Sequence, residues 1–342
     1  MNKSTRDTLI CLAAGAGALI AARALKRRIN IYNMQNRVVL ITGGARGLGL
    51  VIARELAREG ALLAICARDE EELERARAEL TAMGATVFAL PCDVTDKQQV
   101  DQMVRSVQDY FGRIDVLINN AGVIEVGPLE VITLDDFREA MNTHFWGPLY
   151  SILAVLPEMR RRGEGRIVNI SSIGGKFSVP HLLPYSASKF ALTGLSEGLR
   201  AELAESGIVV TTVCPGLMRT GSIRNAIFKG QHRLEYAWFS IGGSLPILSI
   251  DARRAARQII AACKHGDAEV VLTLPGKLAV LFHGIFPGLT ADLLGAVNFL
   301  LPEPGGIGTN RAKGSESESA LSPSILTSLS DRAAIENNQM SN

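Results

Sequence analysis

Short β-rich runs alternate with amphipathic helical stretches between Arg37 and about Leu272, and this alternation constrains the fold more than any other sequence feature. Two runs, VLIT at 39–42 and DVLI at 115–118, are apolar almost throughout, which is typical of strands buried on both faces of a parallel sheet. Strands joined by right-handed helical crossovers predict a single doubly wound α/β domain with a Rossmann-like parallel sheet. The expected strands are 37–41, 61–66, 85–90, 114–118, 166–170, 208–213 and 269–272, and the expected helices lie near 48–59, 69–83, 97–111, 135–161, 185–205 and 251–265.

Three segments flank this domain of residues 37–272. Residues 1–30 contain the apolar run Leu9–Leu25, interrupted only by Arg23, whose length is borderline because about 17–25 residues span a bilayer as a helix. We interpret it as an N-terminal hydrophobic anchor helix; a signal peptide and an ordinary helix of the domain are the alternatives. Residues 273–302 predict an apolar helical extension that covers a substrate mouth or lies on a membrane surface. The serine-rich segment 303–342 predicts a flexible tail.

Composition excludes several classes of protein. Of the 342 residues, 47% are hydrophobic and 20% are charged, which provides ample core material and excludes a disordered chain. The formal net charge of +2 is too balanced for the basic stripe of a nucleic-acid-binding protein. The five cysteines form no C-x-x-C pair and the five histidines share no metal-binding spacing. We therefore predict no disulfide framework, no metal site and a reducing compartment.

A glycine-rich turn follows the first predicted strand and reads Thr42-Gly-Gly-Ala-Arg-Gly-Leu-Gly49. A strand that ends in such a turn and opens a helix presents backbone N–H groups and a helix N-terminus to a pyrophosphate. Glycine is needed there because a Cβ atom would keep the backbone away from the phosphates. The turn at this first β–α junction therefore predicts a dinucleotide site.

This turn and the motifs after it resemble those of the short-chain dehydrogenase/reductase family, whose glycine motif is T-G-x-x-x-G-x-G. The resemblance covers roughly residues 37–272 and includes Asn-Asn-Ala-Gly at 119–122, a serine at 172, Tyr-x3-Lys at 185–189 and Pro-Gly at 215–216. It implies a catalytic set of Asn142, Ser172, Tyr185 and Lys189. It implies a cofactor-binding set of Thr42, Gly43, Arg46, Gly47, Leu48, Gly49, Arg68, Asp93, Val94, Asn119, Ala121, Gly122, Tyr185, Lys189, Pro215, Gly216 and Thr220.

The residues themselves support an acid–base role. Tyr185 and Lys189 are four apart, so on a helix they share one face. A phenol has an ordinary pKa of about 10, and we expect the Lys189 ammonium to lower the pKa of Tyr185 toward neutrality. Lys189 also suits hydrogen bonds to a ribose, and Ser172 suits donation to a carbonyl oxygen that gains negative charge. By resemblance, Asn142 holds a water that connects Lys189 to solvent.

The cofactor preference is predicted from the end of the second strand. Folds that favour the unphosphorylated dinucleotide carry an acid there, whereas this chain has Ala67 followed by Arg68. Arg46 lies within the glycine turn, so two guanidinium groups are available for a 2′-phosphate. We therefore predict NADPH or NADP, with Asp69 binding the ribose hydroxyls as the alternative.

These observations predict an NADP-dependent oxidoreductase that transfers hydride between nicotinamide and a carbonyl or secondary alcohol. Residues 219–250 lie where relatives carry a mobile lid, and their apolar side chains predict a hydrophobic substrate such as a steroid, retinoid or lipid-like compound. The same side chains could instead pack on the body of the domain. The apolar lid residues are Ile223, Ile227, Phe228, Leu234, Tyr236, Trp238 and Phe239. A non-catalytic dinucleotide-binding sensor or scaffold, and a sugar-nucleotide epimerase or dehydratase, are the alternative functions.

Location and assembly follow from the flanks and the resemblance. Two basic residues precede the apolar N-terminal run, and four lie in or just after its end. The positive-inside rule then places the catalytic domain on the cytoplasmic side of a membrane. The resemblance implies a homodimer or homotetramer paired through the long helices near 135–161 and 185–205.

Overall fold

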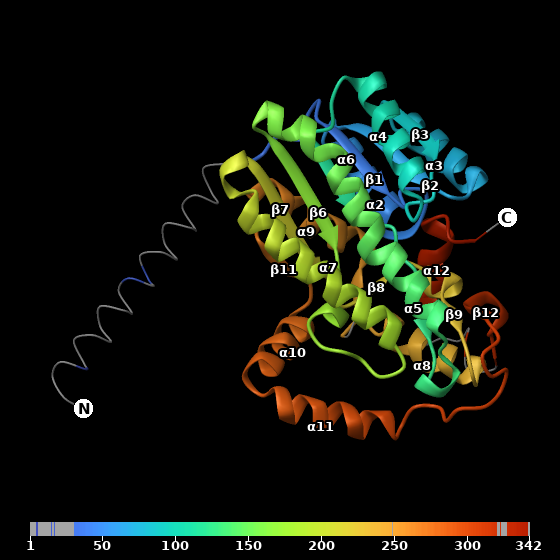
Figure 1. Cartoon of the computed structure of the whole chain (residues 1–342). Helices are drawn as coiled ribbons and strands as arrows, with labels where there is room; N and C mark the ends of the chain where they lie inside the picture. The colour runs from blue at the N-terminus through green and yellow to red at the C-terminus, as the bar shows by residue number, and fades with distance from the viewer. Residues whose placement is uncertain are drawn as a thin grey trace.

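A parallel sheet of seven strands forms the centre of the molecule, in the order β11-β7-β6-β4-β1-β2-β3 (Figure 1). The computed structural model describes residues 31–247, 249–319, 322 and 327–340, together with the single positions 5, 15 and 17. The strands are β1 (Val38–Thr42), β2 (Leu62–Ala67), β3 (Val87–Pro91), β4 (Val116–Asn119), β6 (Gly165–Ile170), β7 (Ile208–Cys214) and β11 (Glu269–Val271). Each coincides with a predicted strand, so the predicted doubly wound, Rossmann-like sheet is confirmed.

Helices cover both faces of this sheet. On one face α2 (Gly47–Arg58), α3 (Glu70–Ala82) and α9 (Ala252–His265) enclose one apolar cluster, and on the other α4 (Lys97–Phe111) and α6 (Gly147–Arg162) enclose a second, with α7 (Leu183–Glu202) beside it. Three of these helices begin at an aspartate whose carboxylate accepts a backbone N–H of the first turn, a strong N-terminal signal. The capping residues are Asp69, Asp96 and Asp251.

The predicted helix 135–161 is interrupted near its start. It consists of α5 (Leu134–Met141) and α6, joined by a π-helical turn at Asn142–Trp146. Single π-helical turns of this kind occur frequently at functional sites, because they reposition side chains without ending the helix. Asn142 is the first residue of this turn.

A smaller layer forms beyond the carboxyl ends of the sheet strands. It contains a three-stranded sheet of β5 (Glu125–Val126), β9 (Ile227–Phe228) and β12 (Ala312–Lys313), and a β8–β10 pair (Leu217–Arg219 and Ser249–Asp251). The helices α8 (His232–Ser244), α10 (Leu274–Ile285), α11 (Pro287–Asn298) and α12 (Ser328–Glu336) complete it. Short 3-10 turns lie at Leu129–Val131, Ile173–Gly175, Ala204–Ser206, Ser222–Asn225 and Gly314–Glu316.

The segment 303–342 differs from the flexible tail that its composition predicts. Its described residues pack on the domain: β12 pairs with β9, and α12 lies against α8. Two of the serines that indicated a solvated tail are instead hydrogen-bonded inside the protein, since Ser322 bonds Ser240 and Ser330 bonds Ser244, each at 2.8 Å. A serine hydroxyl that finds a partner can be buried at little cost, so polar composition alone does not keep a segment in water.

The described parts of the chain contain no helix long and apolar enough to cross a membrane. The N-terminal anchor predicted for 1–30 lies outside the described residues, apart from three isolated positions.

Candidate active site

A cavity of about 630 Å³ opens at the carboxyl ends of the sheet strands. Its walls come from the loops after six of the seven strands, at the point between β1 and β4 where the strand order reverses. Ligands of open α/β sheets bind at this position. The predicted site residues that line the cavity are Gly43, Arg46, Gly47, Leu48, Arg68, Asp93, Val94, Ala121, Gly122, Ser172, Tyr185, Lys189, Pro215, Gly216 and Thr220.

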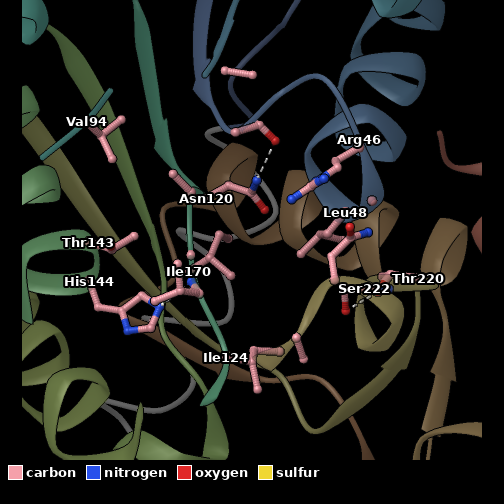
Figure 2. Close-up of a pocket in the computed structure, with 18 of the residues that line it drawn as sticks. Arg46, Leu48, Val94, Asn120, Ile124, Thr143, His144, Ile170, Thr220 and Ser222 are labelled. Atoms are coloured by element: carbon pink, nitrogen blue, oxygen red, sulfur yellow. Dashed lines mark hydrogen bonds between the residues drawn. The ribbon is translucent and has the colours of Figure 1, made fainter. Parts of the chain in front are cut away.

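The glycine turn lines one side of the cavity, where Figure 2 shows Arg46 and Leu48. Gly43 and Gly47 have φ values of +64° and +55°, in the left-handed region that favours glycine. Asn120 holds the turn in place, because its side-chain amide donates to the carbonyl oxygens of Thr42 and Gly43 at 3.1 and 3.0 Å. The N–H groups at the start of α2 therefore point from a fixed loop, as a phosphate-binding turn requires.

Four predicted residues do not line the cavity. Thr42 lies beneath it, where its hydroxyl accepts hydrogen bonds from the backbone N–H groups of Asn120 and Ala121. Gly49 packs closely against the carbonyl oxygen of Gly43 in the turn after β1. Asn119 is buried in the sheet and donates to the side chain of Asn169 at 2.8 Å. Asn142 lies in the π-helical turn. The first three support the loops around the cavity from behind instead of touching its contents.

The Ser–Tyr–Lys set is brought together by β6 and α7. Ser172 follows β6 and caps the next 3-10 turn, since its Oγ accepts the N–H of Gly174 at 3.0 Å. Tyr185 and Lys189 lie one turn apart on α7, and the Lys189 Nζ is 5.6 Å from the centre of the tyrosine ring. The Lys189 Nζ also donates to the carbonyl oxygen of Ile170 at 2.8 Å. The three side chains therefore converge on one wall of the cavity.

Burial dominates the electrostatics of this wall. It raises the pKa of Tyr185, and a hydrogen bond with Ser172 acts in the opposite direction. Burial also lowers the pKa of Lys189 to about 7. The prediction of a Tyr185 pKa lowered toward neutrality is therefore wrong for this structure, because burial of the phenol outweighs the hydrogen bond with Ser172.

The opposite end of the cavity carries the two predicted guanidinium groups. Arg46 forms an ion pair with Glu72 at 2.7 Å, whereas Arg68 is exposed at the cavity rim. Asp69 lines the same region, but its carboxylate caps α3 by accepting the N–H of Glu72 at 2.8 Å. Asp93 accepts the hydroxyl and N–H of Thr95, which fixes the loop after β3. At this end of the cavity, Arg46 is thus already paired with an acid, whereas the exposed Arg68 is available to a ligand.

His144 and Gln339 are among the lining residues that the sequence did not predict. His144, one of the five histidines that share no metal-binding spacing, lines the cavity with its ring 5.4 Å from that of Tyr185. Its Nε2 accepts the N–H of Val123 and its Nδ1 lies 2.7 Å from the Ser188 hydroxyl, while burial keeps its pKa well below the usual value. Gln339, from the predicted tail, also lines the cavity. The position of His144 two residues after Asn142 is the only sequence signal for it.

The apolar residues of the predicted lid mostly pack on the domain. Ile223, Phe228, Tyr236 and Phe239 are buried in a cluster with Val126 and Leu182, and Trp238 packs against that cluster. Of the seven lid residues, only Ile227 lines the cavity. Most of these residues therefore pack on the body of the domain, which is the alternative interpretation. They form the apolar core between the β5-β9-β12 sheet and α8.

Comparison with known proteins identifies the family. A family model described as short chain dehydrogenase matches residues 37–229. The chain is 33% identical over 298 residues to dehydrogenase/reductase SDR family member 7B of Mus musculus, covering 84% of this chain and 90% of that protein. A crystal structure of actinorhodin polyketide ketoreductase with NADPH is similar, with TM-score 0.63, 32% identity and coverage of 72% of this chain and 99% of that one. A gluconate 5-dehydrogenase from Burkholderia cenocepacia in complex with NADP and tartrate gives TM-score 0.64, 27% identity and coverage of 73% and 98%. The chain therefore belongs to the short-chain dehydrogenase/reductase family.

Proposed function

We propose that this protein is an NADP-dependent oxidoreductase that interconverts a carbonyl and a secondary alcohol on a hydrophobic substrate. The observation that carries the proposal is the single cavity in which a glycine turn at a helix N-terminus and the Ser172–Tyr185–Lys189 set face the same space. The turn supplies backbone N–H donors for a diphosphate, and the set supplies a proton donor and a donor for an oxyanion. Relatives named as a ketoacyl reductase and a polyketide ketoreductase support a reaction at a carbonyl group.

The residues present fit a nicotinamide dinucleotide. The glycine turn and the loops of Asp93 and Asn120 would hold its two phosphates and adenosine, and Tyr185 with Lys189 would hold the ribose next to the nicotinamide. When bound, the cofactor supplies or accepts the hydride.

Tyr185 is the proton donor in the reducing direction. Its raised pKa keeps the hydroxyl protonated at neutral pH, so it can give its proton to the substrate oxygen as negative charge develops there. The Ser172 hydroxyl donates a hydrogen bond to the same oxygen, which stabilises the charge before the proton arrives. Lys189, buried beside the tyrosine and held by the Ile170 carbonyl, orients the ring and replaces the transferred proton.

The preference for the phosphorylated cofactor rests on Arg68. Its guanidinium is exposed at the cavity rim directly after β2, and the preceding residue is Ala67 instead of an acid. Arg46 adds a second positive group, although Glu72 already neutralises part of it. Two structural relatives were solved with NADPH or NADP.

The substrate proposal rests on the far end of the cavity. Apolar side chains of Ile124, Met218, Ala226 and Ile227 line it beside the charged side chains of Glu139, Arg311 and Lys313. A bulky carbonyl compound would bury its apolar body against the apolar residues. A steroid, retinoid or lipid-like ketone or alcohol has this character.

We further propose that the protein is membrane-associated through its N-terminal segment, with the catalytic domain on the cytoplasmic side, and that it is a homodimer or homotetramer. Exposed apolar side chains on α6 and α7, including Leu153 and Phe190, support pairing through these helices.

Replacement of Tyr185 by phenylalanine tests the central claim. We expect Tyr185→Phe to lower kcat by about two orders of magnitude or more, because the proton donor is lost, while the Kd for NADPH changes little. Steady-state NADPH oxidation with apolar ketones and fluorescence titration of NADPH provide the two measurements.

The matched control is Tyr150→Phe, which removes the same hydroxyl from a tyrosine of α6 whose ring stacks on Trp146. It should leave kcat unchanged. Retention of more than about a tenth of wild-type turnover by Tyr185→Phe would overturn the mechanism, and turnover of small hydrophilic carbonyls alone would overturn the substrate class.

A further inference from the structure

Residues 327–340, named here the C-terminal strap, end against the glycine turn (Figure 1). The strap consists of Thr327, α12 and the four residues after α12. The backbone N–H of Gly47, the first residue of α2, donates to the carbonyl oxygen of Asn337 at 2.8 Å. This N–H is one of the free donors that a helix N-terminus offers to an anion. In this structure a carbonyl oxygen from the chain itself accepts it.

The strap also fills the space that glycine leaves open at this position. An added Cβ at Gly47 would lie 2.3 Å from the Nε2 of Gln339. Gln339 is buried, lines the cavity, and is held by Asn225, whose amide donates to its backbone and side-chain oxygens at 3.1 and 2.6 Å. The face of Gly47 that a diphosphate would approach is therefore covered by an amide side chain.

Polar contacts to the first βαβ unit hold the strap in place. The Asn338 amide donates to the carbonyl oxygens of Ala45 and Glu72 at 2.9 and 3.0 Å, and Arg75 donates to the Asn338 Oδ1 at 2.9 Å. Arg54 donates to the Asn337 side chain and the Glu336 carbonyl at 3.0 and 2.8 Å. Asn338 adopts a left-handed backbone, which asparagine tolerates better than most residues.

Little apolar surface accompanies these bonds. The hydrophobic residues of the strap that are buried are Ala333 and Ala334. Hydrogen bonds exchange with water at small net cost, whereas buried apolar area does not, so a segment held mainly by hydrogen bonds opens more readily than the core.

We propose that the C-terminal strap is an intrasteric gate that competes with the cofactor's diphosphate for the Gly47 amide. This rests on the proposed function, because it takes the glycine turn as the dinucleotide site. A protein with its strap docked is closed to the cofactor, and only the fraction with the strap released binds it. The apparent Kd for the cofactor is then the intrinsic Kd divided by that released fraction.

Two variants test the gate, one truncated and one full-length. The first ends at residue 326 and lacks the strap. The second, Asn338→Ala, removes the bonds to Ala45, Glu72 and Arg75 without changing a residue of the cavity. We expect the truncated chain to bind NADPH about tenfold more tightly than wild type, and Asn338→Ala about threefold more tightly, by fluorescence titration. Asn298→Ala, an exposed asparagine at the end of α11, is the matched control and should bind as wild type does.

Amide hydrogen exchange supplies an independent readout. Addition of NADPH to wild type should increase exchange in the peptide that covers 327–340, because the bound cofactor displaces the strap. An unchanged or weaker affinity of Asn338→Ala for NADPH would overturn the gate. Protection of the strap from exchange by NADPH would also overturn it, and would indicate a lid that closes over the cofactor. Failure of every form to bind NADPH, the truncated chain included, would instead overturn the proposed function. Asn338→Ala keeps the test decisive if the truncated chain does not fold.

Discussion

At Gly49 the site requires a residue without a Cβ atom. An added Cβ there would lie 2.1 Å from the carbonyl oxygen of Gly43, so only glycine allows α2 to start so close to the end of β1. Thr42 and Asn120 act at the same scale, because their side chains connect the turn after β1 to the loop after β4. None of these interactions touches a ligand, yet together they fix the direction of the N–H groups on which cofactor binding would depend.

Arg68 carries a prediction at this scale. Wild type should favour NADPH over NADH by at least about tenfold in kcat/KM, because the guanidinium forms charge-assisted hydrogen bonds with a 2′-phosphate. In Arg68→Ala that preference should fall to about threefold or less, mainly through a higher KM for NADPH, as measured by initial rates with each cofactor. Arg160→Ala, at an exposed position of α6, is the control that should keep the preference. Equal use of both cofactors by wild type would refute the assignment.

The β5-β9-β12 sheet shows what holds a very short element together. Its strands are two residues long, and an isolated pair of such strands is unstable in water. Ion pairs support them: Lys229, directly after β9, pairs with Asp136 of α5, and Arg311, directly before β12, pairs with Glu125 of β5 at 2.8 Å. Burial, together with the neighbouring Asp136, raises the pKa of Glu125 to about 8. Folding therefore favours the protonated form of Glu125.

This pKa predicts a pH dependence of stability. Between the ordinary pKa of 4.5 and about 8, folded Glu125 holds a proton that the unfolded chain has lost. Unfolding then releases that proton, so this residue makes the free energy of unfolding fall as the pH rises from about 5 to about 8. Glu125→Gln keeps the shape without the titration, so its stability relative to wild type should increase across this range in urea denaturation. Glu205→Gln, in an exposed 3-10 turn, should follow wild type at every pH. A constant difference between Glu125→Gln and wild type would show that the carboxyl group is ionised throughout.

At the scale of the whole molecule, α10 and α11 form an apolar arm below the sheet (Figure 1). Each of these helices buries a single residue, Gly276 in α10 and Thr290 in α11. Most large apolar side chains of the two helices, and Phe286 between them, are exposed: Leu274, Leu278, Leu281, Phe282, Ile285, Phe286, Leu289, Leu293 and Val297. Helices that are apolar on all sides are typical of a protein core or a lipid environment. The arm contacts the loop between Ser172 and Tyr185, where Phe177 lies beside His283.

Membrane fractionation tests the location at this scale. The full-length chain should stay with membranes at high salt, because its N-terminal segment anchors it. A variant that starts at Ile31 lacks this segment and should bind neutral phospholipid vesicles reversibly through the arm. Adding Leu281→Asp and Leu293→Asp to the shorter variant should weaken its vesicle binding by about tenfold or more, because each introduces a charge into the apolar surface. Leu129→Asp, at an equally exposed leucine outside the arm, is the control. A full-length chain that remains soluble without detergent at high salt would refute the proposed anchor.

The sequence by itself determined the central sheet and the edge of the sheet at which its motifs meet. All seven strands are visible because each is a short apolar run between turn and helix signals, and those signals are local. Parallel strands bring their carboxyl ends to one edge, so Gly43, Ser172 and Pro215 had to meet near the switch between β1 and β4.

Only the tertiary structure decided the rest. The strap reaches Gly47 from the opposite end of the chain, and no local pattern encodes that contact. Likewise, the lid residues have the same apolar character whether they face a ligand or a neighbouring helix, and only the β5-β9-β12 sheet determines which. Ser322 and Ser330 are polar in either case, and partners on α8 make their burial possible. Local periodicity specifies which elements form, whereas long-range packing and hydrogen bonding decide what each surface contacts.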